Sequence, residues 1–191
     1  IDDYVAQNFY QPMGLMRTLY NPYEQFDVSR IAPTEDDKIF RGQQVRGYVH
    51  DPGAAMYGGV AGHAGLFGNA VDLTQIAQLL LNKGSYNGKQ YFSEETVTLF
   101  TEQYSDKSRR GLGFDKPEPN GSKQSPCYAK VPLSTFGHTG FTGTCVWSDP
   151  TNRLTFVFLS NRVYPNANNS KILRMNVRSE LQRVIYNALG K

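Results

Sequence analysis

Residues 136–144 read Phe-Gly-His-Thr-Gly-Phe-Thr-Gly-Thr, residues 145–150 read Cys-Val-Trp-Ser-Asp-Pro, and residues 154–161 read Leu-Thr-Phe-Val-Phe-Leu-Ser-Asn. The last two segments are rich in β-branched and aromatic residues, and the turn formers at 149–152 separate them. This pattern predicts two short antiparallel strands joined by a turn. Trp147, in the middle of the first strand, is expected to lie in the core.

The segment before these strands carries few side chains, because it contains three glycines, Gly137, Gly140 and Gly143. A backbone without side chains can lie close to a ligand or to another backbone. His138 and Thr139, next to bare N–H groups, supply the parts of an edge that binds an anion or a carbonyl. From the pattern alone, a glycine-rich hairpin with one surface histidine is an equally good interpretation.

The residue order resembles the third active-site motif of the serine β-lactamase and penicillin-binding-protein superfamily. That motif is usually Lys-Thr-Gly, and His-Thr-Gly is a common variant in class C-like esterases and peptidases. Other segments with a family resemblance follow in the right order: Pro-Met-Gly-Leu-Met-Arg-Thr at 12–18, Gly-His-Ala-Gly-Leu-Phe at 62–67, and Gly-Leu-Gly-Phe at 111–114. The chain is most similar to a subgroup that includes periplasmic penicillin-binding-protein-like hydrolases and the serine-hydrolase domain fused behind family 3 β-N-acetylglucosaminidases in Bacteroidetes.

The resemblance implies an α+β fold, namely the C-terminal portion of the β-lactamase/transpeptidase-like fold. We expect a single partial domain over residues 1–191. Residues 1–110 would form a mostly helical and loop subdomain segment, residues 111–164 the antiparallel strands, and residues 165–191 the C-terminal helix packed on the sheet.

The resemblance also implies a mechanism in which a serine of Ser-x-x-Lys is acylated by a carbonyl substrate. His138 would bond the substrate or the network of the nucleophile, Thr139 would bind polar substrate groups, and the N–H of Phe141 would face the oxyanion. The implied catalytic residues are His138, Thr139, Gly140 and Phe141, and the implied substrate-binding residues are Gly62, His63 and Thr142.

The chain departs from the common motif at two positions. His138 replaces a lysine, and Phe141 replaces a small residue. A neutral histidine binds a carboxylate less strongly than lysine does. We therefore expect weaker recognition of β-lactams and peptidoglycan fragments, which carry carboxylates.

The nucleophile motif is absent, because the sequence contains neither Ser-x-x-Lys nor Gly-x-Ser-x-Gly. Tyr164-Pro165-Asn166 fits Tyr-x-Asn by its letters, but it follows the His-Thr-Gly segment, whereas the family's copy precedes it. We interpret it as a chance match. The chain also starts at Ile1 inside what reads as an amphipathic helix. We expect a fragment of a longer polypeptide, with the nucleophile upstream and no turnover by this piece alone.

Composition limits the remaining function classes. The net charge is 20 − 17 = +3, which does not argue for a nucleic-acid partner, and no apolar run approaches the length of a membrane span. Cys127 and Cys145 either pair or stay free. His50, His63 and His138 with Asp51 lack the spacing of metal ligands, so we expect no metal and no cofactor.

Three functions remain open. The first is the hydrolase fragment, periplasmic or attached to the cell envelope, acting on a small-molecule or peptidoglycan-derived substrate together with the upstream part of its polypeptide. The second is a non-catalytic domain that binds cell-wall material or acts as a scaffold beside a β-N-acetylglucosaminidase. The third possibility is structural: an open sheet edge would pair with a second copy and give a homodimer.

Periodicity predicts the remaining elements. Apolar spacing and caps indicate helices over 1–10, from the Asn69–Asp72 capping pair to Asn82, over 94–103, and over 172–189. In the last helix, Leu173, Val177, Leu181, Val184 and Ile185 are predicted to form the buried face. Residues 21–37 read as loop and residues 40–50 as a small hairpin or strand, and the glycines of 58–68 indicate a loop dominated by backbone.

Overall fold

The computed structural model describes residues 1–119 and 124–190. Its helices are α1 (Asp2–Val5), η1 (Ala6–Tyr10), α2 (Gln11–Met13), η2 (Pro22–Glu24), η3 (Val28–Arg30), α3 (Pro52–Met56), α4 (Ala70–Leu81), α5 (Glu94–Thr101), α6 (Lys171–Arg174) and α7 (Val177–Ala188). Its strands are β1 (Leu19–Tyr20), β2 (Pro33–Asp37), β3 (Gln43–Arg46), β4 (Leu66–Phe67), β5 (Ser85–Tyr86), β6 (Lys89–Gln90), β7 (Phe136–Thr139), β8 (Cys145–Asp149) and β9 (Leu154–Phe158). None of the helices among the described residues is both long and apolar enough to cross a membrane.

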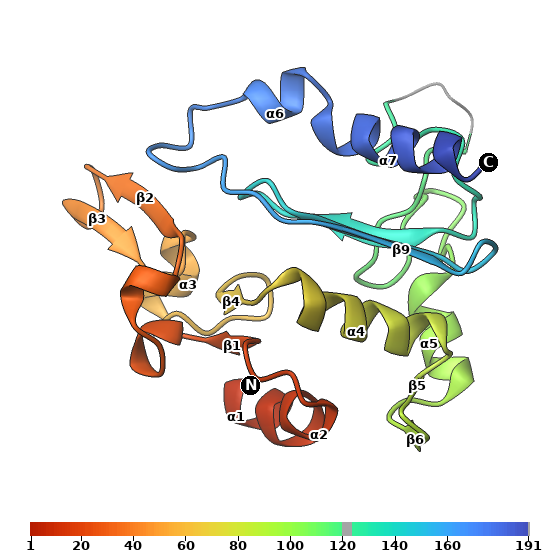
Figure 1. Cartoon of the computed structure of the whole chain (residues 1–191), viewed down its shortest axis with the longest axis horizontal. Helices are drawn as coiled ribbons and strands as arrows, with labels where there is room; N and C mark the ends of the chain where they lie inside the picture. The colour runs from red at the N-terminus through yellow and green to blue at the C-terminus, as the bar shows by residue number, and fades with distance from the viewer. Residues whose placement is uncertain (120–123, 191) are drawn as a thin grey trace.

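The centre of the fold is the antiparallel sheet β7-β8-β9, which has α7 on one face and α4 on the other (Figure 1). Trp147 of β8 is paired with Phe156 of β9, so both side chains point to the same face of the sheet. Both belong to the core cluster that also contains Tyr186 of α7. The predicted hairpin, the α+β architecture and the core position of Trp147, which is 1% exposed, are confirmed.

The C-terminal helix differs from the prediction in two respects. It is divided into α6 and α7, because Asn176 adopts a left-handed conformation at φ 51°. Its buried face is also polar: Ser179, Gln182 and Tyr186 face inward. The predicted apolar face is wrong for Leu173, Leu181 and Val184, which are exposed. Val177 and Ile185 are half-buried, and Ile185 packs against the core cluster.

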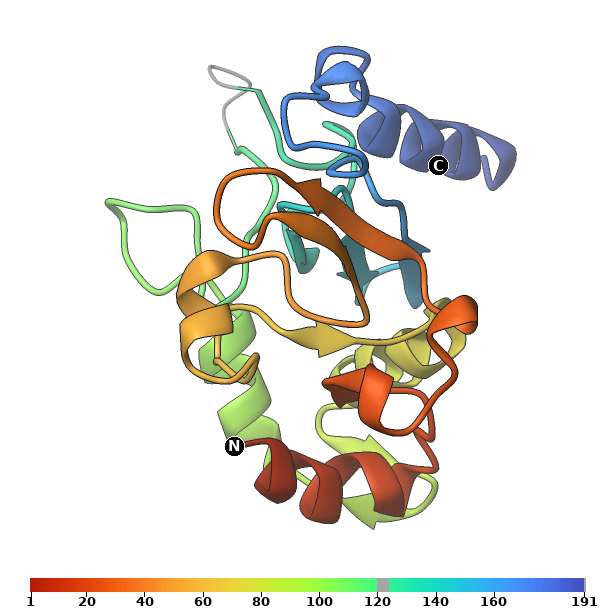
Figure 2. The same ribbon diagram turned by 90° about the vertical axis from the view of Figure 1, so that its left-hand side faces the viewer.

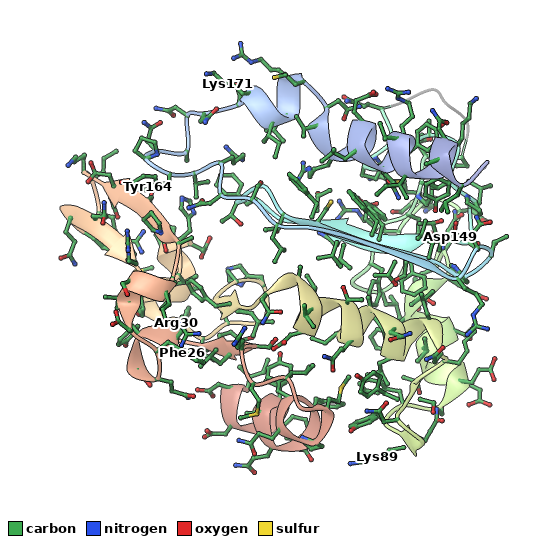
Figure 3. The ribbon with its side chains drawn as sticks, in the orientation of Figure 1. Phe26, Arg30, Lys89, Asp149, Tyr164 and Lys171 are labelled. Carbon is green, nitrogen blue, oxygen red and sulfur yellow. The ribbon has the colours of Figure 1, made fainter. Side chains whose placement is uncertain are left out.

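The polar face of α7 is buried because it satisfies polar groups of the chain it covers. The Gln182 Oε1 accepts a hydrogen bond from the N–H of Tyr128 at 2.8 Å. The Tyr186 hydroxyl donates to Asp149 Oδ2 at 2.6 Å, at the turn between β8 and β9 (Asp149 is labelled in Figure 3). An unpaired polar group in this position would be costly, so hydrogen bonding overrides the hydrophobic pattern.

The N-terminal helical segment runs from Asp2 to Met13 and ends at Gly14, which is left-handed at φ 75°. Met13 and Leu15 pack against Leu79 of α4. The segment 12–18 is also tied to the start of α4, because the hydroxyl of Thr18 donates to Asp72 Oδ2 at 3.1 Å.

The predicted cap of α4 is confirmed. The N–H of Asp72 donates to Asn69 Oδ1 at 2.9 Å, and the Asn69 amide donates back to Asp72 Oδ1 at 3.2 Å. This reciprocal pair satisfies an N–H of the first helical turn. It also leaves Oδ2 of Asp72 free to accept the Thr18 hydroxyl and the N–H of Arg17.

The loop prediction for 21–37 is wrong over Pro33–Asp37, which forms β2 and pairs with β3 in an antiparallel hairpin. The reason is a charge cluster. Arg41 binds Glu35 at 2.6 Å and Asp37 at 2.7 Å, so the acidic side chains of the strand are neutralised. For residues 40–50, where a small hairpin or a strand was predicted, the strand is confirmed: Gln43–Arg46 forms β3, and its hairpin partner β2 lies before this range.

The outer edge of β9 pairs with no other strand among residues 1–119 and 124–190. It presents unpaired backbone groups of the kind that recruit another strand. The homodimer through this edge stays a prediction.

Cys127 and Cys145 are both buried and are not joined to each other. Burial raises the pKa of each thiol to about 11. We expect no rapid reaction with Ellman's reagent at pH 8 in the native protein, and reaction of both thiols after unfolding in guanidinium chloride. Rapid labelling of the native protein would contradict the burial of the thiols. If neither thiol reacts after unfolding, the two cysteines are joined in a disulfide, which would contradict their free state.

Candidate active site

The His-Thr-Gly segment forms β7, and its backbone lies between two partners up to Gly137. The N–H of Gly137 donates to the Asp115 carbonyl at 3.0 Å and its carbonyl accepts from the Asp115 N–H at 2.7 Å, on the side opposite to β8. Backbone groups alternate in direction along a strand. Thr139, two residues on, therefore turns its N–H and C=O to this same outer edge, beyond Asp115.

Arg178 of α7 anchors both ends of the turn that follows β7. Its Nη1 donates to the Gly140 carbonyl at 3.3 Å and to the Thr144 carbonyl at 3.0 Å. Gly140 also donates its own N–H to the Thr144 carbonyl at 2.8 Å, which closes the turn.

The middle of the turn is held by the segment after β9. Arg162 Nε donates to the Phe141 carbonyl at 2.7 Å, and the Arg162 N–H donates to the Thr142 carbonyl at 2.8 Å. The Ser160 hydroxyl donates to the Gly143 carbonyl at 2.8 Å. Together with Arg178, these donors occupy every carbonyl from residue 140 to residue 144.

The same turn also contains the N–H groups of Phe141 and Thr142. In a trans peptide the C=O and N–H point in opposite directions, so a carbonyl held by Arg178 or Arg162 sends the next N–H away from that arginine. Neither N–H finds a protein acceptor within the described ranges. Two neighbouring free N–H groups on a fixed turn form a site that can stabilise an oxyanion.

His138 lies on the exposed side of β7. Its Nδ1 is 2.7 Å from the carbonyl oxygen of Thr139. A carbonyl only accepts, so this hydrogen bond places the proton on Nδ1 and leaves Nε2 of the neutral ring as an acceptor. His138 can therefore accept a proton or a hydrogen bond from a neighbouring donor, and it carries charge only when doubly protonated.

A cavity of about 240 Å³ opens between β7 and the C-terminal helices. Thr139 lines it from the sheet, and Arg178 lines it from α7. Its other lining residues come from the segment before β7 and from the two helices: Gln124, Ser125, Pro126, Ile172, Leu173, Asn176 and Ser179. The cavity thus lies between Thr139 of the sheet and the helices that cover one face of that sheet.

His63 and Gly62 lie on the glycine-rich loop, and no hydrogen bond or ion pair joins them to β7 in the described part of the chain. His63 Nε2 is 3.2 Å from Asp51 Oδ1, and Asp51 caps α3 by accepting the N–H of Ala54 at 2.8 Å. The Ala54 N–H, followed by the hydrogen bond from His63, lowers the pKa of Asp51. These contacts fix the glycine loop to α3.

His50 connects this region to the turn after β7. Its ring lies against the Phe141 ring, with centroids 5.4 Å apart, and its Nε2 is 3.3 Å from Glu35 Oε2. The guanidinium of Arg162 lies 4.4 Å from the centroid of the same Phe141 ring. Phe141 is nevertheless 64% exposed, so it remains accessible to a ligand.

Each of the three histidines lies next to a different partner: His50 next to Glu35, His63 next to Asp51, and His138 next to the Thr139 carbonyl. No group of three His, Cys, Asp or Glu side chains with metal-binding geometry occurs within residues 1–119 and 124–190.

Tyr164 takes part in the docking of the β2–β3 hairpin. Its hydroxyl accepts from Gln44 Nε2 at 3.0 Å, and the Pro165 carbonyl accepts from the Asp36 N–H at 2.7 Å. Figures 2 and 3 show this loop beside the hairpin, with Tyr164 labelled in Figure 3. Asn161 adds hydrogen bonds to the start of β2.

Sequence reasoning missed Arg162 and Arg178, which hold the turn. Arg162 follows Leu-Ser-Asn at the end of the apolar strand, and Arg178 lies in the predicted closing helix. No local pattern distinguishes either of them from a surface arginine. Their role depends on long-range contacts that only the fold supplies.

The chain is similar to known proteins over most of its length. The family model described as "Beta-lactamase" matches residues 1–176. A protein of Escherichia coli K12 named "Putative D-alanyl-D-alanine carboxypeptidase" is 38% identical over 177 residues, which cover 85% of this chain and 40% of that protein. A Salmonella gallinarum protein of the same name is 36% identical over 186 residues, covering 90% of this chain and 42% of that protein.

Two solved structures share the fold. A β-lactamase from Mycobacterium bovis aligns with a TM-score of 0.61 at 17% identity, over 98% of this chain and 56% of that one. A penicillin-binding-protein homologue from Caulobacter crescentus aligns with a TM-score of 0.57 at 19% identity, over 84% of this chain and 46% of that one. The chain spans about two fifths of the length of the curated relatives. Since the family model covers most of its residues, this chain belongs to the β-lactamase family.

Proposed function

We propose that this chain forms one wall of the catalytic cleft of a serine hydrolase that works through an acyl-enzyme. The observation that carries the proposal is the turn 140–144. All of its carbonyls are held by the protein, while the N–H groups of Phe141 and Thr142 are free. A fixed pair of donors next to a free strand edge is suited to bind the carbonyl that is attacked.

In this proposal the nucleophile lies upstream in a longer parent polypeptide. Two observations support it: the chain spans about two fifths of its curated relatives, and its sequence contains no Ser-x-x-Lys. The chain would then supply substrate binding and transition-state stabilisation, without turnover by itself. The division into a helical segment at 1–110, strands within 111–164 and a closing helix within 165–191 is part of the same proposal.

The proposed reaction proceeds in two stages. The serine Oγ attacks the substrate carbonyl carbon and loses its proton to a neighbouring base. The carbonyl oxygen becomes an oxyanion, which accepts a hydrogen bond from the Phe141 N–H. The leaving group departs with a proton, and water then hydrolyses the acyl-enzyme in the same manner. His138 Nε2, the free acceptor of its ring, would take a hydrogen bond from the serine–base network or from the substrate.

The substrate is proposed to lie along the outer edge of β7. Its backbone or amide would pair with the N–H and C=O of Thr139, and Thr142, Gly62 and His63 would contact its remainder. The names of the relatives favour peptides ending in D-alanine, and hence a periplasmic or cell-envelope location. His138 is proposed to bind a substrate carboxylate less strongly than a lysine at this position would.

The alternative function is a non-catalytic domain that binds cell-wall fragments or acts as a scaffold, appended to a β-N-acetylglucosaminidase of the family 3 type. It would use the same edge of β7 without a nucleophile. Reading the residues upstream of Ile1 separates the two, because a parent without Ser-x-x-Lys would exclude the hydrolase.

The test is acylation of the parent polypeptide by a fluorescent penicillin or a fluorophosphonate, with the labelled residue identified by mass spectrometry. We expect one labelled upstream serine, and we expect His138→Ala to lower the labelling rate by about 10²-fold because it removes an acceptor at the reacting centre. The control variant is Arg183→Ala, because Arg183 is exposed and its ionic partner is Glu180. A folded parent without any label would support the binding domain instead.

A further inference from the structure

The turn after β7 is held by two arginines that come from outside the motif. Arg162 lies after β9, and Arg178 lies in the first turn of α7. Neither touches the free N–H groups. Arg178 instead holds the Gly140 carbonyl, which shares a peptide unit with the Phe141 N–H. Arg162 holds the Phe141 carbonyl, which shares a peptide unit with the Thr142 N–H.

Arg162 is connected to the turn by three independent contacts. Its Nε donates to the Phe141 carbonyl, its own N–H donates to the Thr142 carbonyl, and its guanidinium lies over the Phe141 ring. Its Nη1 donates in addition to the carbonyls of Ala167 at 2.9 Å and Asn169 at 3.1 Å. The side chain is therefore anchored at both ends and cannot rotate without breaking several charge-assisted hydrogen bonds.

The orientation of the free N–H groups follows from these contacts. A peptide unit is rigid, so fixing its carbonyl fixes the N–H on its other side. Arg178 sets the unit that carries the Phe141 N–H, and Arg162 sets the unit that carries the Thr142 N–H. Without these donors, the glycines that flank the turn at 140 and 143 would allow other backbone conformations.

On the basis of the proposed function, we infer that Arg162 and Arg178 are positioning residues: they fix the two peptide units on either side of Phe141 and so aim the Phe141 N–H at the oxyanion. They act through the peptide planes of the turn. Catalytic donors lose their effect when they are displaced by a small distance, because transition-state stabilisation depends on preorganised geometry. Arg162 should have the larger effect, since alanine at this position removes both the Nε hydrogen bond to the Phe141 carbonyl and the guanidinium over the Phe141 ring.

The experiment measures the parent polypeptide and its variants Arg162→Ala, Arg162→Lys and Arg178→Ala. The matched control is Arg183→Ala, an exposed arginine of α7 whose ionic partner is Glu180. For each protein, the acylation rate constant with a fluorescent penicillin, the dissociation constant of the preceding complex, and the affinity for a boronic acid that forms a tetrahedral adduct are determined. Hydrogen–deuterium exchange of the peptide that spans residues 140–144 is measured in parallel.

We expect Arg162→Ala to lower the acylation rate by on the order of 10²-fold and the boronate affinity by a similar factor, with the dissociation constant changed by less than about threefold. Arg162→Lys keeps one donor and should recover about tenfold of the loss. Amide exchange in 140–144 should rise in both alanine variants and not in Arg183→Ala.

Equal behaviour of Arg162→Ala and Arg183→Ala, or a loss confined to the dissociation constant, would overturn the inference. The failure of the proposed function is distinct, since it appears as an unlabelled wild-type parent. In that case the exchange measurement alone decides the positioning role: raised exchange in the alanine variants supports it, and unchanged exchange rejects it.

Discussion

Replacement of Gly137 by alanine is expected to destabilise the chain by about 2–4 kcal/mol, because overpacking a sheet centre forces the backbone to move. A Cβ at this position would overlap the Val146 carbonyl oxygen and lie 2.8 Å from both Cα and Cε3 of Trp147. Both obstacles belong to the centre of the sheet, and the backbone of residue 137 is also fixed by Asp115 on its other side. Neither neighbour can move without disturbing the core.

The sign of this effect is informative, since alanine is normally the better residue in a strand by about 0.5–1 kcal/mol. The destabilisation from the steric overlap must therefore exceed the stabilisation that alanine normally brings.

Gly62→Ala is the matched control, because its Cβ would meet no atom within 4 Å and its φ is not in the left-handed region. We expect a change within about 0.5 kcal/mol there. Urea unfolding followed by the fluorescence of Trp147, the single tryptophan, measures both variants. Similar stabilities for the two variants would show that β7 and β8 are farther apart than the structure places them.

The His-Thr-Gly motif was identified from its resemblance to the family's residue order, whereas the strands beside it were predictable from their own composition. The β8 and β9 segments have a strand composition that no helix would tolerate. The cap of α4 was readable for a similar reason, since Asn69 and Asp72 are three residues apart and bond each other. Local chemistry alone determines these features.

The features that sequence reasoning missed depend on distant residues. Strand β2 has the composition Pro-Thr-Glu-Asp-Asp, which disfavours a strand, and it forms because Arg41 neutralises two of its carboxylates. The buried side of α7 is polar because Tyr128 and Asp149 require partners there. The arginines of the candidate site are the same kind of case. Their partners are backbone carbonyls, which carry no sequence signal.

Tyr186 provides the second large effect, which depends on pH. It is 2% exposed, and its hydroxyl donates to the carboxylate of Asp149, which is itself 1% exposed. Burial raises the pKa of the Tyr186 phenol, and the hydrogen bond to Asp149 raises it further. The remaining hydrogen bonds of the carboxylate come from Asn152, at 3.1 Å and 2.7 Å. Tyr186→Phe should therefore cost about 1.5–3 kcal/mol near pH 7, the range for a hydrogen bond to a charged group.

The sign of the pH dependence follows from the raised pKa. The folded protein keeps Tyr186 protonated, whereas the unfolded chain ionises it near pH 10. The contribution of Tyr186 to stability is thus complete below pH 10 and decreases as pH rises above it, at about 1.4 kcal/mol per pH unit. Burial also raises the pKa of Tyr10, to about 12, so the pH dependence of wild-type stability alone does not report on Tyr186 specifically.

The free energy of unfolding in urea should be measured between pH 8 and 11 for the wild type and for Tyr186→Phe. We expect the difference between them to shrink above pH 10, because only the wild type loses the Tyr186 contribution. A difference that stays constant to pH 11 would mean that Tyr186 ionises in the folded protein as it does in the unfolded chain, and that Asp149 is not its partner.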